Sequence, residues 1–66
     1  MNYQKSDKLI VHWWKDGNVN DVISTIGYLV NLNAKEIQLA INKGIEEDII
    51  HIPMDWVFQY GKLTSN

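Results

Sequence analysis

The stretch Asn33–Gly44, NAKEIQLAINKG, decides the fold of this chain because it fits two patterns at once. As a helix it would begin at an asparagine N-cap, with Glu36 three residues later as in a capping box, and end at Gly44 as a C-cap. As a strand it alternates apolar residues with polar or small ones from Glu36 to Ile41. Propensity alone favours the helix.

The residues that precede this stretch favour the strand. The run Val22–Ile26 is a poor start for a pair of helices, and Gly27 stands in the middle of the element. We therefore predict a strand over residues 36–41. The helical alternative makes residues 22–43 a helix-turn-helix, which is typical of a small transcriptional regulator.

Outward from this stretch, the sequence predicts strands separated by short turns. The β-branched and aromatic run Leu9–Trp14 leads into Lys15–Asn18, whose Lys-Asp-Gly-Asn sequence is typical of hairpin turns. Further on, an isoleucine-rich run stops at Pro53, and an alternating aromatic run ends at Gly61. The predicted strands cover residues 8–14, 19–31, 36–41, 48–52 and 56–60.

This layout predicts an all-β fold, a small five-stranded SH3-like or Sm-like barrel. Gly27 supplies a bend that lets a short sheet curl, and Pro53 opens a connection with the length of a single 3₁₀ turn. A chain of 66 residues has room for one small domain. We assign the domain to residues 8–61, with flexible tails over 1–7 and 62–66.

Composition narrows the class of protein. The chain has no cysteine, so it forms neither disulfides nor thiolate metal sites, in keeping with a reducing compartment. No apolar run approaches the roughly 18 residues that a membrane helix needs, and the polar start does not resemble a signal peptide. We expect a cytoplasmic protein with no membrane partner. The formal net charge of -2 argues against a nucleic-acid binder that tracks phosphates.

No pattern in the sequence predicts a catalytic or metal site. No further metal-ligating residues stand at a useful spacing from His12 and His51, so we expect both histidines to be structural or surface residues. The segment from Asp16 imitates the opening of a calcium loop, but Asp21 and Gly27 stand where such a loop needs glycine and glutamate. The sequence shows no nucleophile–base pair and no glycine-rich phosphate loop. We expect no enzymatic activity and no cofactor.

The order of the strand and turn motifs resembles the YolD-like family of small Gram-positive bacterial and mobile-element proteins. The matching segments are HWWKDGNV at 12–19, IGYLVNLNAKEIQL at 26–39 and HIPMDWVFQY at 51–60, and the resemblance spans residues 8–60. It implies an accessory role beside Y-family translesion DNA polymerases. Longer members carry a basic, tryptophan-containing segment ahead of the barrel, where this chain has Met1–Asp7.

Two adjacent tryptophans, Trp13 and Trp14, must point to opposite faces of a strand. Each indole presents roughly 150–250 Å², so one left in water forgoes roughly 4–6 kcal/mol of burial. We expect one indole inside the barrel, and Trp14 on the outer face with Ile10 and His12. Either the N-terminal tail or a neighbouring strand covers that indole, or it belongs to a contact surface for a partner or a second copy.

Two further segments bear on this outer surface. If Trp56, Phe58 and Tyr60 face inward, Val57 and Gln59 face outward. The strand at 48–52 has isoleucine on both faces, which calls for a cover, and homodimerisation is the preferred one. The acidic cluster Glu46, Glu47 and Asp48, placed in the loop before that strand, is predicted to be a secondary contact.

The sequence thus predicts a non-enzymatic protein-interaction module. We expect an accessory or inhibitory factor of the phage, prophage or plasmid type that engages a DNA-repair or replication protein such as a Y-family polymerase. The predicted partner-binding residues are Ile10, His12, Trp14, Glu46, Glu47 and Asp48. Besides the helix-turn-helix regulator, one alternative stays open: a nucleic-acid-binding Sm-like or SH3-like barrel in which a tryptophan stacks on bases.

Overall fold

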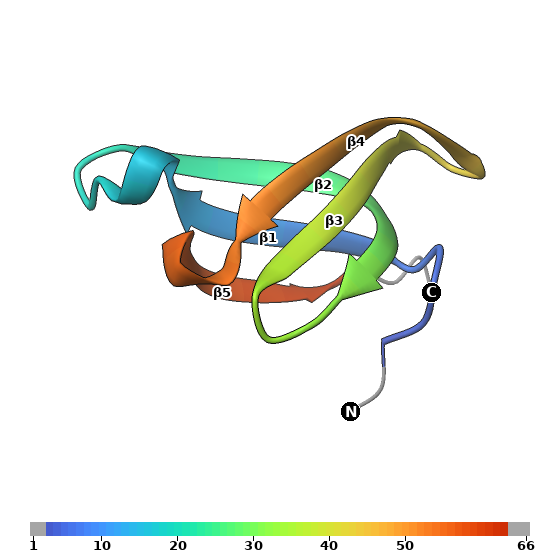
Figure 1. Ribbon diagram of the computed structural model, residues 1–66, viewed down its shortest axis with the longest axis horizontal. Helices are drawn as coiled ribbons and strands as arrows, with labels where there is room; N and C mark the ends of the chain where they lie inside the picture. Colours follow the sequence, from blue (N-terminus) through green and yellow to red (C-terminus); the bar gives the residue numbers. More distant parts are fainter. Residues whose placement is uncertain (1–2, 64–66) are drawn as a thin grey trace.

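Five strands and two 3₁₀ turns make up the part of the chain that the computed structural model describes, which is residues 3–63 without the side chain of Glu46 (Figure 1). The strands are β1 (Lys8–Trp14), β2 (Val22–Leu32), β3 (Glu36–Asn42), β4 (Ile45–Pro53) and β5 (Val57–Lys62). The 3₁₀ turns are η1 (Lys15–Gly17) and η2 (Met54–Trp56). The all-β prediction is confirmed, and η2 lies where a 3₁₀ turn was predicted.

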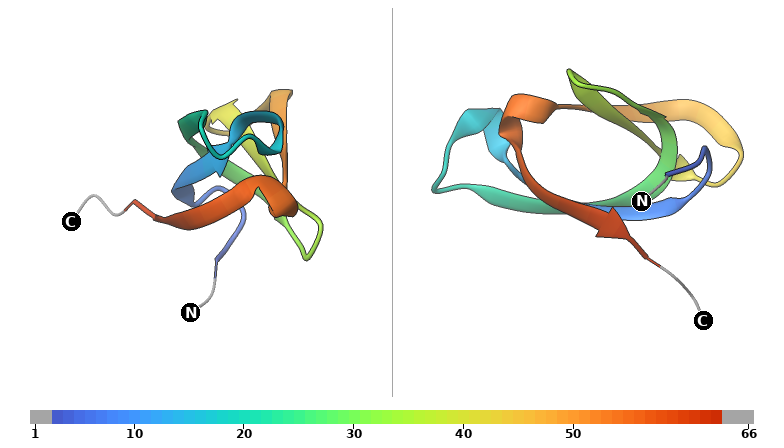
Figure 2. Two further views of the ribbon diagram at one scale, coloured as in Figure 1. Left: turned by 90° about the vertical axis from the view of Figure 1, so that its left-hand side faces the viewer. Right: turned by 90° about the horizontal axis from the view of Figure 1, so that it is seen from below.

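All five strands belong to one antiparallel sheet in the order β4-β3-β2-β1-β5. Only η2 separates the two edge strands, β4 and β5, along the chain, and the sheet curls until η2 passes between its edges (Figure 2). Among the described residues no ladder joins β4 to β5. The sheet is therefore strongly curled but open, and its closure into a barrel is not confirmed.

The stretch Asn33–Gly44 is a turn, a strand and a second turn, so the helix-turn-helix alternative is wrong. The Asn33 side-chain oxygen accepts hydrogen bonds from the backbone N–H groups of Lys35 (2.8 Å) and Glu36 (3.0 Å). These bonds close the β2–β3 hairpin, and they are the bonds that an asparagine would make as a helix N-cap. Gly44 has a φ of +78° in the turn between β3 and β4. Both capping residues therefore serve turns.

The connection between β1 and β2 is longer than predicted. The prediction started the second strand at residue 19, whereas β2 begins at Val22. The N–H of Lys15 donates to the carbonyl of Asp21 (2.8 Å), and the N–H of Asp21 donates to the carbonyl of Asn18 (2.9 Å). These bonds make residues 15–21 a closed loop built on η1 rather than a tight hairpin turn.

The segment Tyr3–Asp7, assigned to a tail, contacts the domain. The Tyr3 ring lies 5.7 Å from the Tyr60 ring and packs against the core. The N–H of Ser6 donates to the carbonyl of Leu29 (2.7 Å), whose own N–H donates to the carbonyl of Asp7 (2.8 Å). These bonds tie the chain ahead of β1 to β2.

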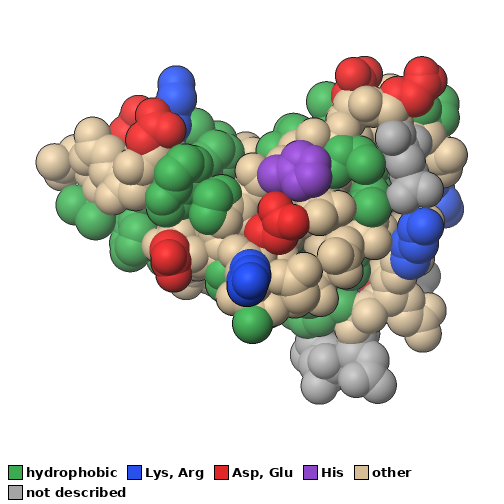
Figure 3. Space-filling view, viewed as in Figure 1, with side chains coloured by type: hydrophobic (Ala, Val, Ile, Leu, Met, Phe, Trp, Pro, Cys, Tyr) green, Lys and Arg blue, Asp and Glu red, His purple; other side chains and the backbone are tan. Residues whose placement is uncertain are grey.

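Acidic side chains lie at several separate places on the surface of the fold. In Figure 3, acidic side chains gather beside η1 and, well apart from them, over the β3–β4 hairpin. The acidic cluster was predicted in a loop, but β4 begins at Ile45, so the cluster lies within this strand. Glu47 and Asp48 are exposed, and the side chain of Glu46 lies outside the described residues. The loop prediction is wrong because β4 starts three residues earlier than expected.

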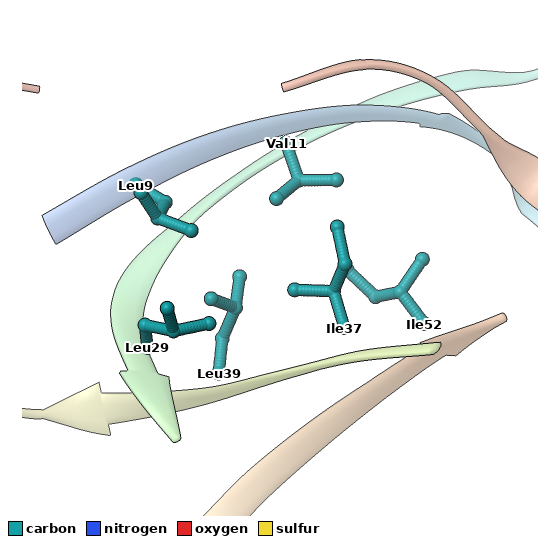
Figure 4. Close-up of a cluster of buried hydrophobic side chains, with 6 residues drawn as sticks. All are labelled: Leu9, Val11, Leu29, Ile37, Leu39 and Ile52. Atoms are coloured by element: carbon teal, nitrogen blue, oxygen red, sulfur yellow. The ribbon is translucent and has the colours of Figure 1, made fainter. Parts of the chain in front are cut away.

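Six aliphatic side chains from four strands point toward one another and form the core (Figure 4). They are Leu9, Val11, Leu29, Ile37, Leu39 and Ile52. The strands come close together at Gly27, where an added Cβ would lie 2.9 Å from the Ala40 carbonyl oxygen and 2.9 Å from the Leu39 Cβ. Only glycine fits this contact without a shift of the backbone. Gly27 therefore lets β2 pack tightly against β3 as the sheet curls.

Candidate macromolecule-binding face

The outer side of strands β5, β1 and β2 carries a group of apolar and aromatic side chains. Directly opposed residues of an antiparallel pair share a face, and the register sets Trp14 opposite Val22 and Ile10 opposite Ile26. His12 stands between these two pairs. We call this surface the outer apolar face; its members are Ile10, His12, Trp14, Val22, Ile26 and Phe58.

The two adjacent tryptophans lie on opposite sides of β1, as a strand requires. Trp13 packs against the core and donates from its indole N–H to the Thr25 hydroxyl oxygen (2.9 Å). Its ring stacks on Trp56 of η2, with centroids 6.0 Å apart and planes 5° apart. Gly17 leaves space for Trp56, because a Cβ there would lie 3.3 Å from the Trp56 indole nitrogen. Trp13 therefore links the core to η2, and Trp56 of η2 in turn lies beside η1.

Trp14 faces outward and a neighbouring strand covers it on one side. Its ring stacks on Phe58 of β5, with centroids 5.1 Å apart and planes 21° apart. The His12 ring lies 6.1 Å from the same Phe58 ring. Phe58 remains 45% exposed, so the aromatic pair itself stands at the surface. Within the described residues, the indole N–H of Trp14 donates no hydrogen bond.

The condition that Phe58 faces inward together with Trp56 and Tyr60 is not met, and a bulge explains why. In the β1–β5 pairing, His12 lies opposite Gln59 and Trp13 lies opposite Val57, so Phe58 is the extra residue between them. An extra residue displaces the alternation of a strand by one position. Val57 consequently packs against the core, although it was expected outside. Tyr60 also packs against the core, as expected.

The two members of the outer apolar face on β2 are exposed, whereas Ile10 of β1 is partly buried. Val22 is 53% exposed and Ile26 is 52% exposed. Between them, Ser24 holds the His12 ring through a 2.7 Å hydrogen bond between its hydroxyl oxygen and Nδ1. Sequence reasoning missed Val22, Ile26 and Phe58. The alternation of faces across the β1–β2 hairpin would have identified Val22 and Ile26. No local sequence pattern predicts the bulge at Phe58.

A second polar group lies on β3 and β4, away from this face. The Gln38 side-chain amide donates to Glu36 Oε2 (2.7 Å), and His51 Nδ1 lies 3.3 Å from Glu36 Oε1. The Gln38 hydrogen bond, and after it the His51 ring, hold the pKa of Glu36 below its usual value. In the part of the chain with described side chains, no cluster of three or more His, Asp or Glu could hold a metal ion.

The structure brings together only half of the predicted partner-binding residues. Ile10, His12 and Trp14 share the outer apolar face. The acidic cluster lies on β4, and β3 and β2 separate this edge strand from β1. Glu47 and Asp48 therefore do not contribute to the same surface, and the side chain of Glu46 is not described.

Comparison of the chain with protein-family models, with curated proteins and with solved structures finds no match. None of the helices in the described residues has the length and apolar character needed to cross a membrane.

Proposed function

We propose that this protein is a non-enzymatic interaction module that binds another protein through the outer apolar face. The observation that carries the proposal is the stack of Trp14 on the 45% exposed Phe58, on the same face as Val22 and Ile26, which are each more than half exposed. Contiguous exposed apolar patches mark interaction sites, and tryptophan is enriched among the residues that dominate binding energy.

The energetics of a small domain support the same conclusion. Full burial of a valine, isoleucine or phenylalanine side chain contributes about 1.5–3 kcal/mol. A core of this size supplies only about 3–5 kcal/mol of net stability. Val22 and Ile26 of β2 and Phe58 of β5, which are left about half exposed, give up a gain comparable to the whole stability of the fold. A partner that covers them would recover that gain on binding.

We further propose that the curled sheet works as an SH3-like or Sm-like barrel. The support is the strand order, in which β5 pairs with β1, together with the single 3₁₀ turn between β4 and β5. In this arrangement the core faces inward, and the opposite side of each strand is free for contacts. The outer apolar face is then the exposed wall of the barrel.

The resemblance to the YolD-like family suggests the kind of partner. We propose a cytoplasmic accessory or inhibitory factor, of the phage, prophage or plasmid type, that engages a DNA-repair or replication protein such as a Y-family polymerase. The secondary contact proposed for Glu47 and Asp48 would be a separate one, since β4 lies at the far edge of the sheet from β5.

Exposed aromatic rings also stack on the bases of single-stranded nucleic acid, which is a second candidate function. The rings of His12, Trp14 and Phe58 would be the platform. Such platforms are accompanied by basic residues that follow the phosphates. Residues 9–14, 22–28 and 57–61 contain no lysine or arginine, and the formal net charge is -2. The charges therefore favour a protein partner.

The test uses two isoleucines that differ in place but not in exposure. Ile26 lies on the outer apolar face and is 52% exposed, while Ile41 lies near the β3–β4 hairpin and is 53% exposed. The chain and its Ile26→Glu, Trp14→Ala and Ile41→Glu variants are titrated against a purified Y-family polymerase from the same organism. Partners captured from a lysate and identified by mass spectrometry are titrated in the same way.

We expect Ile26→Glu and Trp14→Ala each to weaken binding by about tenfold or more, which corresponds to roughly 1.4 kcal/mol or more. Ile41→Glu should bind like the unmodified chain. Equal affinities for Ile26→Glu and Ile41→Glu would refute the proposed face. Binding to single-stranded DNA that weakens steeply with salt would favour the nucleic-acid function instead.

A further inference from the structure

The outer apolar face has a polar row across its middle. The register sets His12 opposite Ser24 of β2 and opposite Gln59 of β5, so these three side chains lie on the same side of the sheet. An apolar row lies on each side of this polar row. One apolar row consists of Phe58, Trp14 and Val22, and the other consists of Ile10 and Ile26. The face therefore combines apolar side chains with hydrogen-bonding groups at its centre.

Three groups in and beside the polar row have no hydrogen-bond partner in the part of the chain that the structure describes. The Ser24 hydroxyl holds His12 through Nδ1 (2.7 Å), and Nε2 of the same ring is left over. The other two groups are the side-chain amide of Gln59, an exposed residue, and the indole N–H of Trp14. A polar group that is removed from water without a partner opposes binding. A ligand that covers the face therefore has to offer hydrogen-bonding groups of its own.

This requirement distinguishes an extended segment from a helix. A helix pairs its backbone N–H and C=O groups internally and presents only side chains to the surface that it covers. It would bury the polar row without pairing it. An extended segment keeps backbone N–H and C=O groups free along its length. Such a segment can pair with His12 Nε2, whichever ring nitrogen carries the proton, and with the Gln59 amide and the Trp14 indole.

The size of the face agrees with an extended segment. Ile10 and Trp14 lie four residues apart on β1, which is about 13 Å, and three strands about 4.8 Å apart make the face about 14 Å wide. These dimensions give roughly 200 Å², whereas a folded partner contributes about 800 Å² to a standard stable interface. An extended segment of about four to six residues is long enough to cross the face. The contact therefore has the size of a short segment rather than of a folded surface.

Charge selects among extended segments. The polar row and the two apolar rows contain no Asp, Glu, Lys or Arg. A charged side chain laid over them would lose water without gaining an opposite charge. Apolar side chains, in contrast, would pack on Val22, Ile26 and Phe58, which are each about half exposed. The face therefore favours a segment that is uncharged where it crosses the strands.

We propose that the outer apolar face recognises an extended, uncharged segment of the partner protein. The backbone of this segment hydrogen-bonds to His12, Gln59 and Trp14, and its apolar side chains pack on the two apolar rows. The inference rests on the proposed function, since it names the element of the partner that the face binds. A segment this short binds weakly by itself, with a Kd of about 10 µM or higher.

The experiment begins with a displayed library of random peptides of about sixteen residues, long enough to form a helix as well as to lie extended. Peptides that bind the full chain and do not bind its Ile26→Glu variant are selected and synthesised. Their affinities are measured by isothermal titration calorimetry. We expect the residues that the selected peptides share to be uncharged and to lack the period of about three to four residues that a helix imposes.

Two substitutions then test the hydrogen bonds themselves. Gln59→Leu should weaken binding of the selected peptides by about fivefold because the amide is lost, whereas it should strengthen binding of a purely apolar ligand. Trp14→Phe keeps an aromatic ring beside Phe58 but removes the indole N–H, and it should also weaken binding by about fivefold. Gln4→Leu changes an exposed glutamine outside the face and should have no effect. Far-ultraviolet circular dichroism of each variant confirms that it remains folded.

Three results would overturn the extended segment. They are selected peptides whose apolar residues recur about every three to four positions, a Gln59→Leu variant that binds as tightly as the unmodified chain or more tightly, and a library that yields no peptide dependent on Ile26. In each case the proposed function stands if Ile26→Glu still loses the partner protein. Peptides that bind as expected, together with a partner protein that Ile26→Glu still binds, would instead overturn the proposed function while the face keeps its preference for extended segments.

Discussion

The adjacent tryptophans should differ sharply in what they contribute to stability. Trp13 packs against the core, stacks on Trp56 and donates a hydrogen bond to Thr25. Trp14 has one ring contact of comparable closeness, with Phe58, on the surface of the sheet. Truncation of each to alanine is the same chemical change at neighbouring positions, so the comparison isolates the effect of orientation.

The expected magnitudes follow from these contacts. Truncation of a core aromatic side chain to alanine costs about 3–5 kcal/mol, and for Trp13 this includes the stack on Trp56. For Trp14 we expect about 1–2 kcal/mol, since the stack on Phe58 contributes about 0.5–1.5 kcal/mol and the rest of the indole is partly solvated. A domain with about 3–5 kcal/mol of stability is then largely unfolded by Trp13→Ala and remains folded with Trp14→Ala.

Urea denaturation followed by far-ultraviolet circular dichroism measures both variants, because indole fluorescence itself changes with the substitutions. A third variant, Thr25→Val, removes the hydroxyl acceptor with little change of shape and should cost about 1 kcal/mol. The reasoning is refuted if Trp14→Ala destabilises the protein as much as Trp13→Ala. Such a result would mean that the fold, rather than a partner, requires the outer indole.

Three further substitutions test the local structure. Gly27→Ala should lower stability by about 1–3 kcal/mol in thermal unfolding, because the new methyl meets the Ala40 carbonyl oxygen at 2.9 Å; an unchanged midpoint would contradict the close approach of β2 and β3. Asn33→Ala should cost about 1 kcal/mol in urea unfolding, since two backbone N–H groups lose their acceptor, and no loss would show that the turn forms without it. The folded pKa of Glu36 lies below the unfolded value, so its charged form stabilises the fold at neutral pH, and this contribution disappears as the pH falls below the ordinary value of 4.5. Glu36→Gln should therefore lose less stability than the unmodified chain when the pH is lowered from neutral to acidic. Urea midpoints that fall equally in both proteins would contradict a stabilising role of the Glu36 carboxylate.

How much of this structure the sequence can predict depends on whether the determining contact is local. The two-residue period of a strand suffices to put Trp13 and Trp14 on opposite sides. Asn33 is ambiguous because its side chain would make the same hydrogen bonds in a helix cap and in a hairpin turn. The neighbouring run of β-branched residues, rather than the asparagine, favours the strand there.

The orientation of Phe58 could not be predicted from its own segment. The alternation around it is regular in sequence, and the bulge arises only when β5 pairs with β1, a strand more than forty residues earlier. The acidic cluster illustrates the same limit. Its residues suggest a solvated loop, but pairing with β3 extends β4 through them. Non-local pairing thus decided the place of Phe58 on the candidate face, whereas Val22 and Ile26 follow from the β1–β2 hairpin.

The distribution of charge distinguishes the surfaces that resist association from the one that permits it. The edge strand β4 carries exposed Glu47 and Asp48, and charges on an edge strand oppose pairing with another strand. The outer apolar face contains no charged residue, although its Val22, Ile26 and Phe58 are exposed. Pairing of another strand with the β4 edge is therefore not expected, whereas apolar contacts with another molecule are expected through the face. A carboxylate introduced at Ile26 would place on the face a charge like those that oppose association at the β4 edge. It should impair association without impairing folding.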